Sequence, residues 1–153
     1  MAIDPKEFRA ALGRFLSGVT VVSTEQEGTV HAMTASAFMS VSLDPPLVLV
    51  SVGKKARFHD AVSETKRYGV SILTDSQQPL SYYFAGRPGE LAVQWERNGF
   101  GSPVLPEALA HLDCTVEQIV EAGDHTLFIG RVLALRSGEG MPLVYFRGHY
   151  GLY

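Results

Sequence analysis

The distribution of hydrophobic and polar positions along the chain predicts a mainly β protein with a few helices. Short runs rich in Val, Leu, Ile and Phe are bounded by Gly, Pro and Asp, as is typical of strands joined by turns. The connections are short, which favours antiparallel pairing and a barrel over a doubly wound sheet. The predicted strands cover residues 19–23, 29–34, 39–43, 47–52, 68–73, 112–117, 126–136 and 143–146.

Helical spacing predicts the first element. Asp4 can act as its N-cap, Pro5 suits the first helical position, and Glu7 stands where a capping box has its carboxylate. The apolar positions that follow lie on a single helix face: Phe8, Ala11, Leu12, Phe15 and Leu16. Gly18 is placed to end this helix.

Two shorter helices are predicted further along the chain. One covers residues 56–65 and the other covers residues 77–85, with Ser76 as its cap. Three apolar residues of the first of these helices are expected to face inward: Phe58, Ala61 and Val62.

The segment between residues 86 and 106 shows no periodicity. It holds four glycines and three prolines together with Trp95, so we expect a long loop or lid, and loops of this length are often functional. In the strand that follows, Leu112, Cys114 and Val116 alternate with polar residues. This alternation predicts a half-exposed strand with Asp113 on the solvent side.

Composition limits the classes of function. The chain has 153 residues, of which 46% are hydrophobic and 19% charged, so it can form one domain over residues 1–153. The net charge of −3 and the lack of a basic cluster argue against binding to nucleic acid or to an anionic membrane. No apolar run approaches the ~20 residues that span a bilayer. The first ten residues lack the apolar core of a signal peptide, so none is expected.

The chemistry-bearing side chains exclude several common sites. Cys114 is the one cysteine, so an internal disulfide is excluded and a reducing cytoplasm is the expected location. Its place on the apolar side of a strand predicts a core residue. The five histidines show no metal-ligand spacing, so no metal is expected. Glycine-rich Rossmann and P-loop motifs are absent from the sequence.

The segment 33–56 concentrates small hydroxyl residues and cations. The turn Asp44-Pro45-Pro46 predicts a strand pair that brings Thr34-Ala35-Ser36 and Ser51 to one end of a sheet. Three cations follow Gly53 before a predicted helix: Lys54, Lys55 and Arg57. Small residues allow a ring to approach the backbone, and cations at a helix N-terminus favour a phosphate. Outward strand hydroxyls and a solvated charged face would account for the same residues, and that alternative stays open.

At these residues the chain resembles the flavin reductase-like, split-barrel family, and within it the small reductase components of two-component flavin-dependent monooxygenases. The resemblance extends over nearly the whole chain. Its motifs are Phe8–Gly18, Thr34–Val50 with Ser51, Tyr83–Arg87, Gly123-Asp124-His125, Gly130, Pro142–Tyr145, Gly148 and Tyr150. Many members have Asn where this chain has Ser36, and serine keeps a donor and an acceptor with a shorter reach.

The resemblance implies a split β-barrel, assembled as a homodimer, with a flavin site. Main-chain groups near Thr34 would hold the isoalloxazine ring, and Ser51 with Lys55, rather than Lys54, would hold the phosphate. Arg87 would meet a phosphate or the flavin tail, while Gly86 also fits a plain helix end. The cofactor-binding residues implied in this way are Met33, Thr34, Ala35, Ser36, Ser51, Val52, Lys55, Ala56, Phe84, Ala85, Gly86, Arg87, His125 and Tyr150.

Gly123-Asp124-His125 is the candidate catalytic motif. Gly and Asp are ordinary turn formers, and a single His is more often structural than catalytic. In the family the matching His lies near the reactive face of the flavin and contacts the nicotinamide cofactor. The resemblance therefore implies His125 as the catalytic residue, with a role in orienting the dinucleotide. Tyr150, more than His149, would close the same pocket.

The function implied by the resemblance is that of an NAD(P)H:flavin oxidoreductase. It would transfer a hydride from NADH or NADPH to FMN or FAD and supply reduced flavin to a partner monooxygenase. An enzyme that keeps its flavin tightly bound and reduces another acceptor remains an alternative. A flavin- or haem-binding module without turnover is an alternative from a different class. The sequence decides neither FMN against FAD nor NADH against NADPH.

Overall fold

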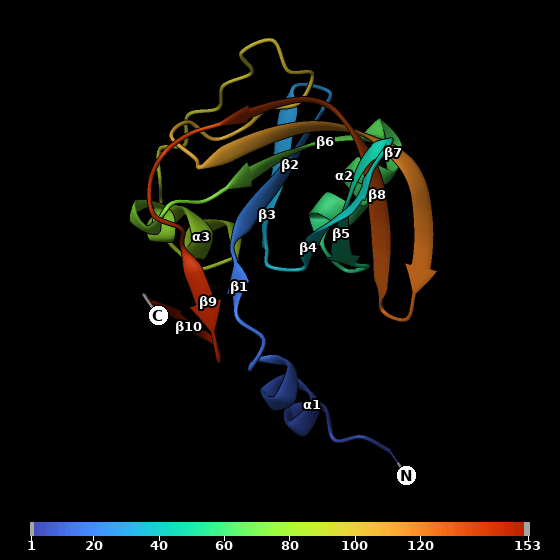
Figure 1. Ribbon diagram of the computed structural model, residues 1–153, viewed down its shortest axis with the longest axis vertical. Helices are drawn as coiled ribbons and strands as arrows, with labels where there is room; N and C mark the ends of the chain where they lie inside the picture. The colour runs from blue at the N-terminus through green and yellow to red at the C-terminus, as the bar shows by residue number, and fades with distance from the viewer. Residues whose placement is uncertain (1, 152–153) are drawn as a thin grey trace.

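The computed structural model describes residues 2–151 and consists mainly of β-strands (Figure 1). Of the helices in this range, none is long and apolar enough to cross a membrane. The elements in chain order are α1 (Pro5–Leu12), β1 (Ser17–Gly18), β2 (Thr20–Gln26), β3 (Thr29–Ala35), β4 (Phe38–Leu43), β5 (Pro46–Gly53), α2 (Arg57–Thr65), β6 (Arg67–Ile72), the 3-10 turn η1 (Asp75–Gln77), α3 (Gln78–Phe84), β7 (Ala110–Ala122), β8 (His125–Ser137), β9 (Val144–Phe146) and β10 (His149–Gly151).

Seven of the strands form one curled antiparallel sheet in the order β3-β2-β6-β7-β8-β5-β4. Its two edges come together at the short link between β3 and β4. There the Phe38 N–H donates to the Ser36 carbonyl at 3.0 Å, and the Ser51 N–H donates to the Ala37 carbonyl at 3.0 Å. The curled sheet and its nearly joined edges make a split β-barrel, so the predicted fold class is confirmed (Figure 1).

The barrel core is built mainly from valines of the sheet and from one face of α2. Phe58, Ala61 and Val62 of α2 are buried, as the helical spacing predicts. Tyr68 of β6 is fully buried as well, and its hydroxyl donates to the Phe128 carbonyl of β8 at 3.1 Å. This bond satisfies a polar group that burial would otherwise leave without a partner, so Tyr68 can fill the barrel interior.

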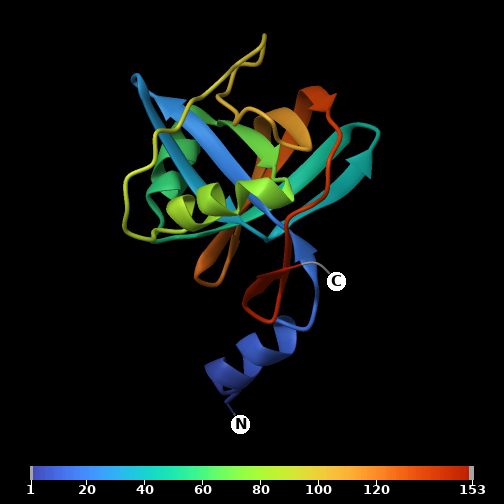
Figure 2. The same ribbon diagram turned by 90° about the vertical axis from the view of Figure 1, so that its left-hand side faces the viewer.

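A second layer packs against β2, β3 and β6. It contains the short sheet β1-β9-β10, helix α3 and part of the segment 86–106 (Figure 2). The Leu105 N–H donates to the Ser71 hydroxyl at 2.9 Å, and the Ser23 hydroxyl donates to the Pro103 carbonyl at 2.5 Å. The predicted loop is therefore present, but its second half is fastened to the barrel and does not form a free lid.

Two predictions about helix ends were wrong. Helix α1 ends at Leu12 instead of Gly18, because Ser17 and Gly18 pair with β9. The helix near residue 77 has its capping box at Thr74 and Gln77, not at Ser76. The end of α1 depends on tertiary pairing, and the cap near residue 77 depends on which of two neighbouring hydroxyl residues is used. Hydrophobic spacing predicts neither of these.

Asp113 also differs from its prediction. It is buried, with 3% of its surface exposed, although the alternation placed it on the solvent side. Its carboxylate accepts from the Arg67 guanidinium at 3.2 Å and from the Gly101 N–H at 2.8 Å. The long segment 86–106 covers this side of β7, and the buried charge is stabilised by the ion pair it makes there.

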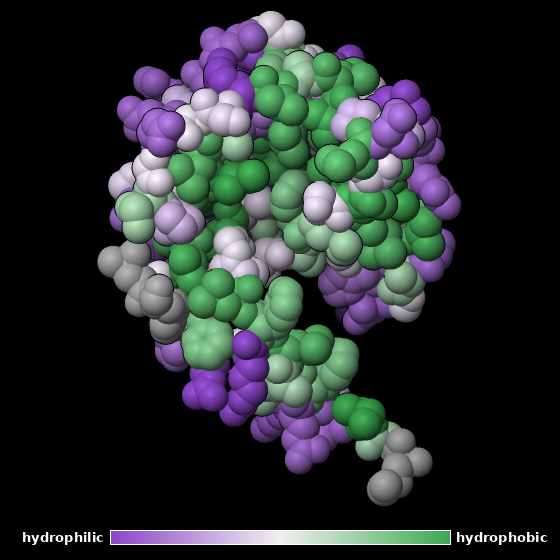
Figure 3. Space-filling model, in the orientation of Figure 1, coloured by the Kyte–Doolittle hydropathy of each residue, from purple (hydrophilic) through white to green (hydrophobic). Residues whose placement is uncertain are grey.

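Apolar side chains are exposed on two adjacent parts of the surface. Helix α1 leaves the barrel and carries its apolar face in the open, with Phe8 55% and Leu12 58% exposed. The outer faces of β4 and β8 are also apolar, and Figure 3 shows hydrophobic atoms over this side of the molecule. The exposed residues of these strands are Met39, Val41, Leu43, Leu133 and Leu135. A patch of this kind is typical of an interaction surface.

Candidate functional site

A cavity of about 180 Å³ lies between the end of β3, the end of α3 and the short C-terminal sheet. It is lined by Val19, Thr34, Ser36, Ala85, Tyr145 and Tyr150. Four of these residues are among those predicted to bind the cofactor: Thr34, Ser36, Ala85 and Tyr150. The structure thus brings together residues that are up to 116 positions apart in the sequence, from Thr34 to Tyr150.

Hydrogen bonds centred on Ser81 of α3 hold the walls of this cavity. The Thr34 hydroxyl donates to the Ser81 carbonyl at 2.6 Å, and the hydroxyls of Ser81 and Tyr150 are hydrogen-bonded to each other. The Tyr150 ring also meets Tyr82 edge to face, with 4.9 Å between centroids. The polar groups at the cavity are therefore held in place by the fold.

A wider cleft of about 610 Å³ adjoins this cavity and shares Val19 and Ser36 with it. Ser51 also lines the cleft, together with Phe38, Phe15 from the segment after α1, and Leu49 of β5. The turn between β4 and β5 places Ser36 and Ser51 side by side, as the sequence predicts, because Phe38 pairs with Val50. An apolar cleft that ends at small residues and hydroxyls suits a flat ring system with polar edges.

The cations that follow Ser51 have different surroundings. Lys54 pairs with Glu121 of β7 at 2.6 Å, and its N–H donates to the Asp124 carbonyl at 3.0 Å. The hydrogen bond from the Lys54 side chain lowers the pKa of Glu121. For Lys55 no ion pair is present among residues 2–151. Arg57, the first residue of α2, has no ion pair among these residues either, so both cations are available to an incoming anion at the start of this helix.

His125 is the first residue of β8 and pairs with Gly53 at the end of β5. Its Nδ1 lies 2.8 Å from Asp124 Oδ1, and about half of the side chain is exposed. The bond to His125 lowers the pKa of Asp124, so that carboxylate is ionised. The imidazole of His125 is therefore held in one orientation, opposite Gly53, which lies between the residues predicted to bind the phosphate, Ser51 and Lys55.

A second histidine supports the same hairpin. His59 of α2 is hydrogen-bonded through Nε2 to the Thr126 hydroxyl at 2.8 Å, and its ring meets Phe128 edge to face. Thr126 follows His125 directly and is buried. This contact fixes α2 against β8, and it was not predictable from local sequence because the partners are 67 residues apart.

The other predicted site residues lie away from the cavity. The side chains of Met33 and Val52 pack into the barrel core. Phe84 packs against Trp95, and the Arg87 guanidinium stacks on Tyr82, 3.8 Å from the ring centroid. Gly86 has a φ of +95°, which a glycine adopts without strain.

The sequence-based prediction missed three residues at the cavity. Two of them line it, Val19 and Tyr145, and the third, Ser81, is bonded to lining residues. One signal could have indicated Ser81: it stands four residues before Ala85, so the two share a helix face. Tyr145 lies in the motif Pro142–Tyr145 without a role assigned to it. Val19 follows β1 and was read only as a strand residue.

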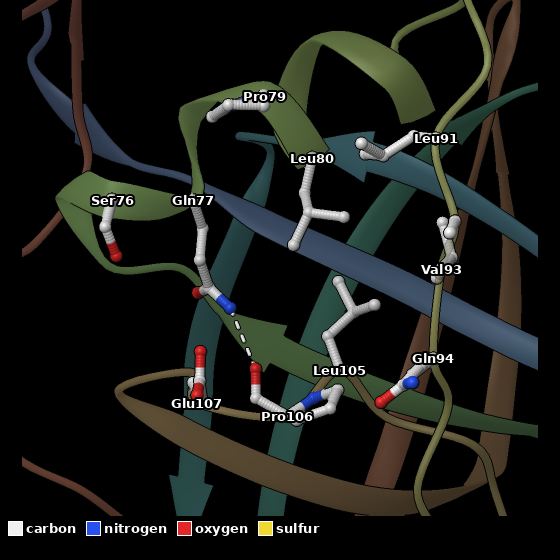
Figure 4. Close-up of a pocket in the computed structure, with 11 residues that line it drawn as sticks. Ser76, Gln77, Pro79, Leu80, Leu91, Val93, Gln94, Leu105, Pro106 and Glu107 are labelled. Carbon is white, nitrogen blue, oxygen red and sulfur yellow. Dashed lines mark hydrogen bonds between the residues drawn. The ribbon is translucent and has the colours of Figure 1, made fainter.

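A separate pocket of about 360 Å³ lies between η1, α3 and the segment 91–94 (Figure 4). Leu80, Val93 and Leu105 point into it, and the Gln77 amide donates to the Pro106 carbonyl at 2.9 Å along one side. The polar groups on its rim do not form a cluster of catalytic type. Within the described part of the chain, no group of His, Cys, Asp or Glu could hold a metal ion.

Comparison with protein families gives one match, to the family described as the flavin reductase like domain, over residues 12–152. An NADH-dependent flavin reductase from a Rhodococcus species is 49% identical over 97% of this chain and 86% of that protein. The reductase subunit HsaB of a flavin-dependent monooxygenase from Rhodococcus jostii is 38% identical over 97% of this chain and 78% of its own length.

Solved structures give the same result. The flavin reductase PheA2 in its native state superposes with a TM-score of 0.95 at 49% identity, with 99% of each chain covered. The NADH:FAD oxidoreductase SgcE6 of Streptomyces globisporus C-1027, in complex with NAD and FAD fragments, gives a TM-score of 0.91 at 33% identity. The match covers all of this chain and 96% of that one.

Proposed function

The chain belongs to the flavin reductase like domain family, and from this premise we propose that it is an NADH-dependent flavin reductase. It oxidises NADH, reduces FMN or FAD, and supplies the reduced flavin to a partner monooxygenase. The observation that carries this function is the convergence of Thr34, Ser36, Ala85 and Tyr150 on one cavity beside the cleft that holds Ser51. The whole chain, residues 1–153, acts as one domain in this proposal.

The residues at the cavity fit a flavin. Ala85 and the β3–β4 link offer little side-chain bulk, so a ring can approach the backbone. The Ser36 hydroxyl can donate and accept at the polar edge of the ring, and the Thr34 hydroxyl, which donates to Ser81, can accept there. The Tyr150 ring forms one wall of the cavity, with its hydroxyl bonded to Ser81. Ser51 and Lys55 bind the phosphate in the proposal, with backbone groups of Met33, Ala35, Val52 and Ala56 along the ring and ribityl chain. Phe84, Gly86 and Arg87 border the tail of the ligand.

The protein's part in the reaction is to bind and to orient. When bound, the flavin accepts at N5 the hydride that the nicotinamide gives up at C4, so the cofactors supply the redox chemistry. His125 contacts the dinucleotide and keeps the nicotinamide over the flavin, with its ring orientation fixed by Asp124. Holding two rings in contact converts a collision into an intramolecular step, and this gain can be large.

Anaerobic mixing tests the proposal. Purified protein, FMN and NADH are combined without oxygen, and the visible absorbance of the flavin is followed. Bleaching that needs protein, flavin and NADH together supports a reductase, and parallel runs with FAD and NADPH give both preferences. Flavin that binds but keeps its colour in the presence of NADH contradicts the proposal and indicates a binding module.

A homodimer is part of the proposal. The apolar residues of α1, β4 and β8 are exposed, and a second copy of this chain would cover them. Sedimentation velocity tests this: a species of twice the chain mass is expected, and Leu43→Asp, at a residue that is 96% exposed, should shift it toward a single chain. A wild-type protein that sediments as a single chain contradicts the dimer.

The partner oxygenase and the location follow from the same function. A reductase that releases reduced flavin needs an oxygenase to consume it. The relative from Rhodococcus jostii is named as the reductase subunit of a flavin-dependent monooxygenase. Cys114 is free and buried, which agrees with the reducing cytoplasm that we propose for this protein.

A further inference from the structure

We propose that Ser81 is a positioning residue that fixes Tyr150 as a rigid wall of the ligand cavity and thereby sets the affinity for flavin. The proposal rests on the function proposed above, because it concerns the ligand of the same cavity. Ser81 belongs to no recognised site motif in the sequence. Its side chain is fully buried in α3, and its role follows from its contacts alone.

Three of the six residues that line the cavity are bonded to Ser81. Its carbonyl accepts from the Thr34 hydroxyl at 2.6 Å and from the Ala85 N–H at 3.1 Å, and its hydroxyl is bonded to the hydroxyl of Tyr150. Ser81 therefore joins β3, α3 and β10 at one point. Removing the hydroxyl alone leaves the contacts of the Ser81 carbonyl in place, so the effect of Ser81→Ala is specific to Tyr150.

Tyr150 depends on this contact for its position. It lies in β10, a strand of three residues at the edge of a small sheet. Its ring is flanked edge to face by Tyr82 at 4.9 Å and by Tyr145 at 5.2 Å, and these contacts allow the ring to slide. Among the described residues, the hydrogen bond to Ser81 is the one directional contact that the hydroxyl of Tyr150 makes. Hydrogen bonds fix direction where aromatic packing does not.

Loss of the Ser81 hydroxyl should therefore weaken flavin binding and leave the chemical step nearly unchanged. A net hydrogen bond contributes roughly 0.5–1.5 kcal/mol, which corresponds to a change in Kd of about two- to tenfold. Hydride transfer runs between the two ligands, so kcat at saturating flavin should change by less than about twofold. A merely structural serine would lower the melting temperature without this division between Kd and kcat.

The test compares Ser81→Ala, Tyr150→Phe and the double variant. The Kd for FMN is measured by flavin fluorescence without NADH, and kcat is measured at saturating FMN. We expect Ser81→Ala and Tyr150→Phe each to raise the Kd about fivefold, and the double variant to match either single variant, because both changes remove the same bond. Ser63→Ala is the control, since among the described residues the Ser63 hydroxyl donates only to the His59 carbonyl of α2, at 2.6 Å.

Two results would overturn the proposal: an unchanged Kd in Ser81→Ala, or effects that add in the double variant. Should Ser81→Ala fold poorly, Tyr150→Phe tests the same bond from its half-buried end. The outcomes are separable from the proposed function. Wild-type protein that binds FMN without reducing it contradicts the proposed reductase function. The role of Ser81 in flavin binding is still decided by the measured Kd values in that case.

Discussion

Nδ1 of His125 lies 2.8 Å from Oδ1 of Asp124 at the tip of the β7–β8 hairpin. Because the pKa of Asp124 is lowered, first of all by this hydrogen bond, the carboxylate is an acceptor and Nδ1 is assigned as the donor. Nε2 is then the nitrogen free to meet a ligand, and it lies on the side of Gly53, where a Cβ would be 3.9 Å away. The pair thus presents Nε2 of His125 in a fixed direction, beside the residues predicted to bind the phosphate.

His125→Ala should lower kcat/KM for NADH about two- to tenfold, because a hydrogen bond to the uncharged nicotinamide of NADH contributes roughly 0.5–1.5 kcal/mol. The Kd for FMN should stay within about twofold, since His125 does not line the flavin cavity. Steady-state kinetics and flavin fluorescence measure the two quantities. His149→Ala, at another exposed histidine, is the matched control. Loss of flavin binding in His125→Ala contradicts this role.

Lys55→Ala should weaken FMN binding about tenfold and leave riboflavin binding nearly unchanged, because only FMN carries the phosphate that a cation can pair with. Lys54→Ala is the matched control, since Lys54 already pairs with Glu121 at 2.6 Å. Binding titrations with both flavins test the difference. Equal losses for FMN and riboflavin would move the phosphate site away from Lys55.

The β4–β5 hairpin was predictable because two prolines mark its turn and apolar residues flank it. The inward face of α2 was predictable for a similar reason, as Phe58, Ala61 and Val62 follow helical spacing. Both predictions use information within a dozen residues. The small hydroxyl residues at the end of β3 stood out by composition, and the structure places Thr34 and Ser36 at the cavity.

The missed features depend on residues far apart in the sequence. Asp113 is buried because Arg67, 46 residues away, pairs with it. Strand β1 exists because Ser17 pairs with Tyr145. The role of Ser81 requires Tyr150, 69 residues later. Local periodicity carries no record of such partners, so a single sequence indicates the elements and the candidate residues but not their connections.

Gly130→Ala should destabilise the barrel. A Cβ at this position would overlap the Tyr68 hydroxyl and come within 3.0 Å of Cys114 Cβ, and both neighbours are fully buried. Overpacking of this kind costs about 1–3 kcal/mol in the free energy of unfolding. Urea denaturation measures it, with Gly18→Ala as the control because that Cβ would meet nothing within 4 Å. A Gly130→Ala protein as stable as wild type contradicts the close packing of Tyr68.

Cys114 should be unreactive in the folded protein and should make stability fall at alkaline pH. Burial, with a smaller contribution from the charge of Asp113, raises the pKa of its thiol from 9.0 to about 12. Below pH 9 both states hold the proton. Between pH 9 and 12 the unfolded state releases it first, so the free energy of unfolding decreases.

Cys114→Ala should remove that part of the alkaline slope, while the contribution that burial of Tyr68 makes to the slope remains in both proteins. Iodoacetamide labelling and urea denaturation at several pH values provide the measurements. Native thiol that labels as fast as denatured thiol contradicts the burial argument.

The most direct test of the central claim is the rate of NADH oxidation at increasing concentrations of added FMN, FAD or riboflavin, with flavin in excess over protein. The account predicts many turnovers per protein and a rate that saturates in added flavin, because the flavin is reduced in the cavity and then leaves. A rate that does not respond to added flavin, in a protein that binds it, would contradict the account and indicate a tight flavoprotein or a binding module.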